Sequence, residues 1–455
     1  MTATELATEG RPVLDSREAL YALARWAVKS ACDAGADEAA VSVSRGGSYE
    51  LSRRDQRVEK AAASRSMGLS LEVLVDDRFS SHSTSDLRLE ALKVFIRRAI
   101  DATRLLEKDR DRRLPERSAC GSSELALDLH DRTYAKVTSE DRRAWAEQME
   151  SAMLAHEGRA AMRSTTAQWW DGWSDSVIVY SNGFEAEREG TFFGMGAELT
   201  LEDKDGRLPE AMGFYSTRHF EDLPSAEQIA EEAWTKGEER LGSGPTESGR
   251  YPLLLDRRAA GRVLGVLLGP MGGASLHQGR SCLQDKIGEQ IGPETLSIYD
   301  DPTLVRGSRS RHFDGDGFPS IRRAVMENGR LSMYFLGQYH ARKLEMEPTT
   351  AGASNLFIAQ GDRSVGAILG SLPRCIRVDS FLGGNSNSAN GDFSFGIRGM
   401  LFENGEPVQP VSEMNISGNL FTLLPRFAEA ANDTWRYSSV VSPSLLFDDI
   451  QFSGL

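Results

Sequence analysis

Few residues of this chain could do chemistry, and their spacing fits no familiar catalytic site. Zinc hydrolases place two histidines on one face of a helix with a glutamate beside the first, so that metal ligands and general base share a scaffold. The only His-Glu pair is His156-Glu157, and the positions where a second histidine would stand are Ala160 and Ala161. A histidine near the end of a helix is the simpler interpretation.

Other arrangements of nucleophiles, bases and phosphate-binding glycines are also absent from the sequence. It contains no P-loop, no dinucleotide-binding glycine motif opening a helix and no nucleophilic-serine elbow. A metal site built from His277, His312 and Cys375 is conceivable, although no spacing supports it. The sequence thus predicts no catalytic residue and no metal ligand in this chain.

Two polar loops in the last part of the chain contain the candidate binding residues. Residues 311–319 alternate carboxylates with glycines, as at the start of a calcium loop. The twelfth position counted from Asp314 is Val325, where such a loop needs a glutamate, so a tight turn is favoured.

Residues 383–396 combine asparagines, serines and glycines with two phenylalanines. Their amides and hydroxyls could hold a peptide at a hairpin tip, and an ordinary turn explains the same composition equally well. The polar and aromatic residues of note are Asp314 and Asp316 in the first loop, and Asn387, Asn390, Asp392, Phe393 and Phe395 in the second.

The composition narrows the class of protein. The chain has 455 residues, 40% hydrophobic and 26% charged, as in an ordinary globular protein. Its 67 acidic and 53 basic residues give a net charge of −14, which argues against a nucleic-acid partner. The sequence has no apolar run of membrane-spanning length, and charged residues among the first twenty leave no room for a signal-peptide core. Four scattered cysteines without a CxxC pair fit a reducing compartment, so we expect a cytoplasmic protein with no membrane partner.

Two connector-like segments divide the chain into three parts. Residues 108–117 are a charge run, and residues 242–249 are rich in glycine, serine, proline and threonine. We therefore expect an α+β fold with three domains. These are an N-terminal α+β domain over 1–117, a middle α+β domain over 118–245 and a larger β-rich domain over 246–455.

The first two parts share one plan of helices and strands. Helices are expected over 15–32 (with an Asp15/Glu18 capping box), 86–106 and 140–156, and from Ser225 with Gln228 completing a second box. Strands are expected at 40–44, 49–53 and 68–75, with hairpin turns at 181–183 and 204–206. The third part should contain one helix, over 257–268, and two Glu-Asn-Gly hairpins at 327–329 and 403–405.

Seven stretches of the third part resemble the TldD/PmbA family, the so-called modulators of DNA gyrase. They are DKIGEQ (285–290), YDDP (299–302), FDGDG (313–317), YHARKL (339–344), NGDFS (390–394), ENGE (403–406) and ISGN (416–419). The resemblance implies three domains and a cytoplasmic heterodimer of two related chains. One chain, the TldD type, carries zinc on a HExxxH helix with a later cysteine and hydrolyses unfolded or short peptides in an enclosed chamber. The other, the TldE or PmbA type, lacks those ligands.

This chain departs from the family's catalytic pattern. The helix expected to carry HExxxH precedes residues 287–289, and here residues 262–273 read RVLGVLLGPMGG; no cysteine follows Cys375. The resemblance therefore implies a non-catalytic TldE/PmbA-type subunit, with zinc only in a TldD-type partner and a peptide as substrate. It also implies which residues line the substrate chamber: the candidates, taken from the motif positions in the two loops, are Asp314, Asp316, Asn387, Asn390, Asp392, Phe393 and Phe395. The alternatives are a peptide-binding scaffold or maturation factor without a peptidase partner, and an independent hydrolase with an unrecognised site.

Overall fold

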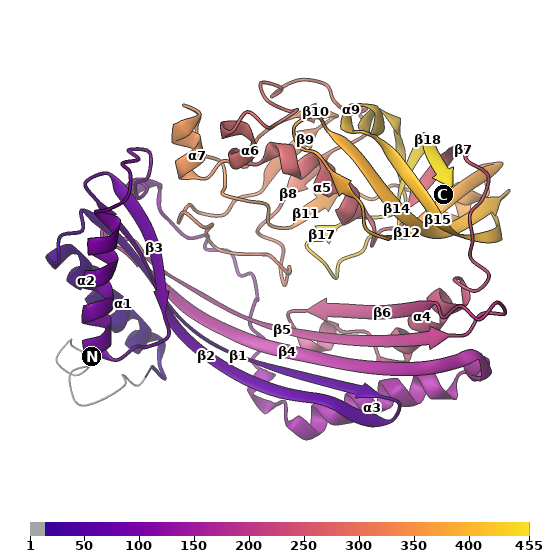
Figure 1. Ribbon diagram of the computed structural model, residues 1–455, viewed down its shortest axis with the longest axis horizontal. Helices are drawn as coiled ribbons and strands as arrows, with labels where there is room; N and C mark the ends of the chain where they lie inside the picture. The colour runs from indigo at the N-terminus through magenta and orange to yellow at the C-terminus, as the bar shows by residue number, and fades with distance from the viewer. Residues whose placement is uncertain (1–13, 455) are drawn as a thin grey trace.

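A long, curved sheet of six antiparallel strands dominates the N-terminal half of the chain (Figure 1). The structure is a computed structural model and describes residues 14–454; most of the first twenty residues, considered above for a signal peptide, lie outside this range. The strand order is β3-β2-β1-β4-β5-β6. The strands are β1 (Glu38–Arg54), β2 (Arg57–Val75), β3 (Arg78–Thr84), β4 (Met162–Tyr180), β5 (Glu185–Leu201) and β6 (Glu210–Thr217).

The expected α+β fold with three parts is confirmed, but the first two parts are joined through this one sheet. β1 pairs with β4 without interruption from Ala40↔Tyr180 to Arg54↔Thr166. The strands expected at 40–44 and 49–53 are therefore a single strand. Gly46 and Gly47, which lie between the two expected strands, stay extended because both neighbouring strands pair with them.

Four helices cover one face of this sheet. They are α1 (Arg17–Asp33), α2 (Leu89–Thr103), α3 (Ser139–Ala155) and α4 (Ala226–Glu238). Successive strand residues face opposite sides, so the apolar odd-numbered residues, such as Val41 and Trp169, lie under the helices. The capping box of Ser225 and Gln228 is confirmed. The expected box of Asp15 and Glu18 is wrong, because Ser16 Oγ accepts the capping hydrogen bond from the Ala19 N–H.

The C-terminal part contains two further sheets. The seven-stranded sheet has the order β12-β7-β18-β15-β14-β13, with β16 paired to β18. Its strands are β7 (Gly249–Leu255), β12 (Arg374–Phe381), β13 (Asn385–Ser386), β14 (Asp392–Glu403), β15 (Glu406–Asn419), β16 (Phe427–Ala430) and β18 (Leu445–Gly454). The five-stranded sheet, of order β10-β9-β8-β11-β17, consists of β8 (Ile298–Asp300), β9 (Arg323–Glu327), β10 (Arg330–Leu331), β11 (Leu356–Ile358) and β17 (Val440–Val441).

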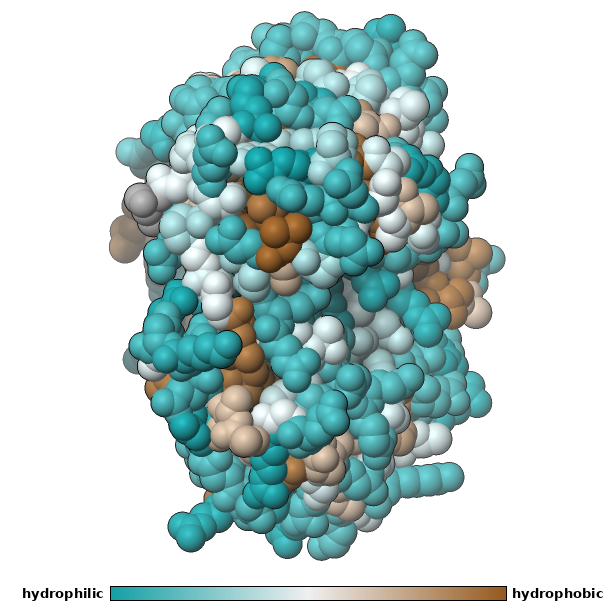
Figure 2. All heavy atoms as spheres, turned by 90° about the vertical axis from the view of Figure 1, so that its right-hand side faces the viewer, coloured by the Kyte–Doolittle hydropathy of each residue, from teal (hydrophilic) through white to brown (hydrophobic). Residues whose placement is uncertain are grey.

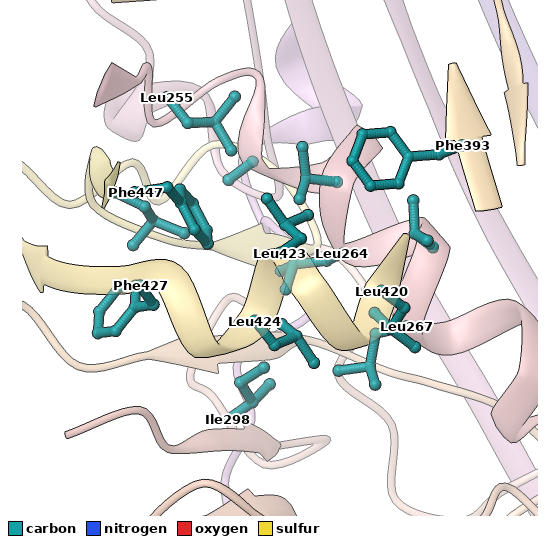
Figure 3. Packing of buried hydrophobic residues seen from close by; sticks show 14 of the residues in the cluster. Leu255, Leu264, Leu267, Ile298, Phe393, Leu420, Leu423, Leu424, Phe427 and Phe447 are labelled. Carbon is teal, nitrogen blue, oxygen red and sulfur yellow. The ribbon is translucent and has the colours of Figure 1, made fainter. Parts of the chain in front are cut away.

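Five helices accompany these sheets, where the sequence had suggested only one. They are α5 (Ala260–Met271), α6 (Gly273–His277), α7 (Gln338–Lys343), α8 (Val365–Leu369) and α9 (Leu420–Leu423). Of these, α5 and α9 pack in the core shared by the two sheets, and α8 packs on the other face of the seven-stranded sheet. Leucines of α5 and α9 meet in the apolar core shown in Figure 3. Both Glu-Asn-Gly hairpins are confirmed, and the Asn328-Gly329 and Asn404-Gly405 pairs have positive φ as such turns require.

The surface is mainly hydrophilic on the face shown in Figure 2, with apolar residues in separate spots. Within residues 14–454, no helix has both the length and the apolar character needed to cross a bilayer.

Candidate functional site

The face of the six-stranded sheet that the four helices leave free looks toward the C-terminal part of the chain (Figure 1). Strand alternation places mostly small and polar even-numbered residues here. From β1, β2 and β4 these include Ser44, Gly46, Ser48, Ser64, Ser66, Ser70, Gly172 and Ser174. Hereafter we call this surface the free face.

Two pockets lie where the free face meets the C-terminal part. The first has a volume of about 570 Å³ and lies between Phe192 and Ser216 of the sheet and residues 304–308 and 436–438. The second, of about 640 Å³, lies between Met212 and Phe214 of β6 and residues of α5 and β12. Both pockets lie beside the long free face of the sheet. A long surface with pockets at its side suits an extended polypeptide ligand.

The loop at residues 311–319 forms the tight turn that the sequence favoured. Asp314 is buried, and its Oδ1 accepts hydrogen bonds of 3.0 Å from the N–H groups of Asp316 and Phe318. Arg188 on β5 donates to the Asp314 carbonyl oxygen at 2.6 Å and lies over the ring of Phe313. Asp314 thus belongs to a joint between the C-terminal part and the sheet, and a contact with substrate stays a prediction.

Asp316 has a different environment, because it approaches the free face. Its Oδ2 accepts a hydrogen bond of 2.8 Å from the Gln338 N–H. Burial raises the pKa of Asp316, and the nearby Asp314 charge adds to this. Glu72 on β2 keeps contact with solvent, yet desolvation by the surrounding protein and the Asp316 charge raise its pKa too. Sequence reasoning missed Glu72, since nothing in its strand marks it as different from its neighbours.

The loop that connects β13 to β14 is held by its own side chains. The Asn390 Nδ2 donates to Asp392 Oδ2 at 2.6 Å, and its Oδ1 accepts from the Asp392 N–H at 3.1 Å. Asn419 Nδ2 donates to Asp392 Oδ1 at 2.8 Å. Asn387 Oδ1 accepts from the Ala389 N–H at 2.9 Å, and its side chain is exposed. The loop is an ordered turn, and the lining role of these three polar residues stays a prediction.

Phe393 and Phe395 lie in the core, although the sequence suggested that they contact substrate. Their exposed fractions are 5% and 1%, and their rings stack with centroids 5.4 Å apart. Figure 3 shows Phe393 among the packed leucines of α5 and α9. The alternation of β14 turns both odd-numbered rings inward. Direct contact with substrate is therefore not available to them in this structure.

The residues present do not fit a zinc ion. The side of α5 open to solvent presents Arg262, Gly265 and Gly269, none of which ligates zinc, while Val263, Leu264, Val266 and Leu267 are buried. A Cβ at Gly265 would meet no atom within 4 Å. The described part of the chain contains no group of three or more His, Cys, Asp or Glu side chains placed to hold a metal. We therefore assign no metal-dependent step to this chain.

The conceivable site of His277, His312 and Cys375 is not assembled. His312 Nδ1 is bonded to the Ser123 carbonyl at 2.9 Å, and the ring of His277 lies 6.2 Å from that of His340. Cys375 is fully buried among apolar residues, and burial raises the pKa of its thiol to about 12. These three residues occupy separate environments, which their spacing in sequence could not reveal.

Comparisons with known proteins assign nearly the whole chain to one set of domain families. Residues 39–103 match the PmbA/TldA metallopeptidase domain 1, residues 132–241 the central domain and residues 248–454 the C-terminal domain. The metalloprotease PmbA of Escherichia coli O157:H7 is 26% identical over 423 residues, covering 92% of each chain. A metalloprotease PmbA homologue of Haemophilus influenzae is 26% identical over 432 residues, covering 94% of this chain and 95% of its own.

Solved structures agree with these matches. A crystal structure from Bacteroides thetaiotaomicron, named as a candidate modulator of DNA gyrase, superposes with a TM-score of 0.93 at 33% identity. It covers 97% of this chain and 100% of its own. TldE of Thermococcus kodakarensis shares the fold, with a TM-score of 0.80 at 22% identity over 95% of this chain and 100% of its own.

Proposed function

Because the chain belongs to the PmbA/TldD metallopeptidase family, we propose that it is the TldE/PmbA-type subunit of a two-chain peptidase that degrades or processes unfolded peptides. In this proposal the chain supplies part of the wall of a peptide chamber. A TldD-type partner with a HExxxH helix supplies the zinc. The pair acts in the cytoplasm, in keeping with four cysteines that form no disulfide.

The observation that carries the proposal is the open side of α5. This helix lies where the resemblance places the HExxxH motif, and it presents Arg262, Gly265 and Gly269 in place of ligands. The fold of the family is nevertheless kept along the whole chain. A subunit that keeps the architecture but not the ligands is suited to shaping a chamber and holding substrate.

The free face supports a role in holding peptide. Its small side chains leave room above the sheet for an extended chain, and their hydroxyl groups can exchange hydrogen bonds with peptide groups. Ser48 and Ser64, on adjacent strands, already lie 2.9 Å apart by their hydroxyl oxygens. The two pockets beside the free face, of about 570 and 640 Å³, admit the side chains of an extended peptide and are far too small for a folded protein.

The test is reconstitution from separately purified chains. We expect no peptide cleavage by this chain alone, and zinc-dependent cleavage after mixing with a HExxxH homologue from the same source. The mixture should exceed the homologue alone, and a chelator should abolish the activity. Cleavage by the isolated chain that survives repeated purification and chelation would contradict the proposal, as would a homologue whose activity does not change on mixing.

Metal analysis of the dialysed chain gives an independent test. We expect far less than stoichiometric zinc, since a structural or catalytic site needs three or four ligands from one cluster. The HExxxH homologue, treated in parallel, is the positive control. One tightly held zinc per copy of this chain would show that a metal site exists which the described residues do not reveal.

A further inference from the structure

Four apolar side chains gather on the free face near the β6 edge of the sheet, and we call them the apolar patch. They are Trp170 on β4, Phe192 on β5, and Met212 and Phe214 on β6. Phe192, Met212 and Phe214 are exposed by 38%, 40% and 46%, and Trp170 is half-buried. Large exposed apolar groups collected on one surface are typical of a binding site.

Glycines on the neighbouring strands let two of these rings lie flat on the sheet. A Cβ at Gly194 would stand 2.0 Å from the Trp170 indole, and one at Gly172 would stand 2.5 Å from the Phe192 ring. Any other residue at these positions would force the rings away from the sheet. A ring that lies flat offers its whole outer face, which suits contact with an apolar side chain of a ligand.

The apolar patch continues into the 570 Å³ pocket, which Phe192 helps to line. This pocket also contains Arg218 and Arg436, and neither has a carboxylate within 4 Å among the residues that the structure describes. Arg218 donates instead to three backbone carbonyl oxygens: Nε to Gly307, Nη1 to Thr191 and Nη2 to Ser308, the last at 2.6 Å. Arg436 is exposed and lies beside the Tyr437 ring.

The acidic groups near this pocket are already engaged. Asp222 is the acidic residue in its lining, and its carboxylate is paired with Arg306 at 3.1 Å. Asp128 and Glu221 are bound to the same arginine, at 2.7 Å and 2.6 Å. Arg306 is therefore fully occupied by these three carboxylates. Arg436 donates no side-chain hydrogen bond among the described residues, and Arg218 retains one further N–H on each of Nη1 and Nη2, so both arginines can donate to an incoming carboxylate.

We propose that the apolar patch and this pocket together bind an extended peptide in which apolar residues precede a carboxylate. The apolar side chains rest on Trp170, Phe192 and Phe214, and the carboxylate meets Arg218 and Arg436. The four-residue step from Phe214 to Arg218 along the strand spans about 13 Å, so a ligand segment of similar length reaches both ends. This inference rests on the proposed function and names the substrate class of that chamber.

The carboxylate has two sources, the peptide's own C-terminus or an acidic side chain. Fluorescence anisotropy of a labelled pentapeptide of alanine, leucine and phenylalanine, added to the full chain without a partner, separates them. The peptide is made with a free C-terminus, with an amidated C-terminus, and amidated with glutamate as its last residue. Tightest binding by the first form identifies a C-terminal site, tightest binding by the third identifies a site for an acidic side chain, and equal binding by these two identifies a site for either carboxylate.

Three substitutions then locate the site on the chain. Phe192→Ser and Phe214→Ser should each weaken binding about 3- to 10-fold, as expected for loss of one aromatic contact. Arg436→Gln should weaken binding of the free-acid peptide by a similar factor and leave the amidated alanine-leucine-phenylalanine peptide unchanged. Matched controls are Val94→Ser and Arg97→Gln on α2, which covers the opposite face of the sheet; Val94 is 51% exposed. The controls should leave both affinities unchanged.

Several outcomes would overturn the inference. The first is equal peptide affinity for the wild-type chain and the two phenylalanine variants. The second is that amidation of the peptide changes its affinity for none of the chains. The third is that the wild-type chain does not bind the peptide at millimolar concentration. Thermal melting of each variant shows whether a loss reflects unfolding; a loss of affinity that follows the loss of stability also counts against the inference. Peptide binding by the patch without zinc-dependent cleavage in the reconstituted pair would overturn the proposed function alone.

Discussion

Arg142 on α3 and Asp171 on β4 form a buried ion pair with two parallel contacts. The Nε–Oδ2 distance is 2.5 Å and the Nη2–Oδ1 distance is 2.8 Å, and the two side chains are exposed by 9% and 0%. Trp169 Nε1 and the Tyr134 hydroxyl donate to the same carboxylate, at 2.5 Å and 2.7 Å. One carboxylate therefore fixes a helix, the sheet and the segment before the helix in a single arrangement.

Removing this carboxylate should destabilise the fold strongly. Asp171→Ala leaves the Arg142 charge and two further donors buried without an acceptor, so we expect a loss of about 3–5 kcal/mol in the free energy of unfolding. Urea denaturation measures it. The control is Glu90→Ala, which removes an exposed ion pair to Lys93 and should cost less than about 1 kcal/mol. Equal losses in the two variants would show that burial does not govern the Asp171 interaction.

Local features of the fold could be predicted from the sequence, because their causes are local. The Asn328-Gly329 and Asn404-Gly405 pairs specify turns through backbone conformation alone, and Ser225 with Gln228 specifies a helix start through hydrogen bonds three residues apart. The shared sheet could not be predicted in this way. The pairing of β1 with β4 joins residues more than a hundred positions apart, and nothing near Val41 indicates Val179 as its partner.

In the candidate site, too, local turns could be predicted from the sequence and contacts between distant strands could not. Residues 311–319 were predicted to form a tight turn, whereas for residues 383–396 a turn and a peptide-binding tip were left equally open; the structure contains a turn in both segments. The apolar patch was missed, because its members come from three strands and meet only when the sheet forms. A signal did exist, since Gly194 and Gly196 alternate along β5 with the buried Met195. Alternating glycines in a strand mark a surface that something else must approach closely.

Substitution by alanine should lower the stability of the fold at Gly194 and raise it at Gly265. Gly194→Ala places a methyl group inside the Trp170 indole, so we expect a loss of about 1–3 kcal/mol in stability or displacement of the ring. Gly265→Ala adds a methyl to the open side of α5, where nothing lies within 4 Å, and should add about 0.5–1 kcal/mol. Thermal melting compares both with the wild type. A stabilising Gly194→Ala or a destabilising Gly265→Ala would mean that the contacts at these two positions differ from the ones described.

Cys375 should react with an alkylating agent only when the chain is unfolded. Burial raises the pKa of the Cys375 thiol to about 12, and the side chain has no exposed surface, so it stays protonated and inaccessible at pH 8.5 in the folded chain. Unfolding restores an ordinary thiol pKa, near this pH, and exposes the group. Alkylation followed by mass spectrometry should leave Cys375 unmodified in buffer and modify it fully in urea. Rapid modification of Cys375 in buffer would contradict the packing of its strand.

The loop between β13 and β14 supplies the last prediction, which concerns substrate contact by Asn387. Its Oδ1 is used within the turn, but its Nδ2 has no protein partner among the described residues and the side chain is exposed. Asn387→Asp keeps the acceptor and removes the donor. If Nδ2 donates to a substrate carbonyl, kcat/KM of the reconstituted pair should fall a few-fold to tenfold, equivalent to about 0.5–1.5 kcal/mol, with melting and zinc content unchanged. Asn387→Ala should lower kcat/KM by at least as much.

Asn390 gives the structural comparison within the same loop. Both of its side-chain groups bond Asp392, so Asn390→Asp brings two carboxylates together and Asn390→Ala removes both bonds. We expect each Asn390 variant to lower turnover together with the melting temperature, whereas Asn387→Asp lowers turnover alone. Asn404→Asp, in the turn between β14 and β15, controls for a new charge at an unrelated hairpin. Unchanged turnover in both Asn387 variants would contradict substrate contact by this loop. Its asparagines would then serve only the hydrogen bonds within the loop, and peptide recognition would be assigned to the free face.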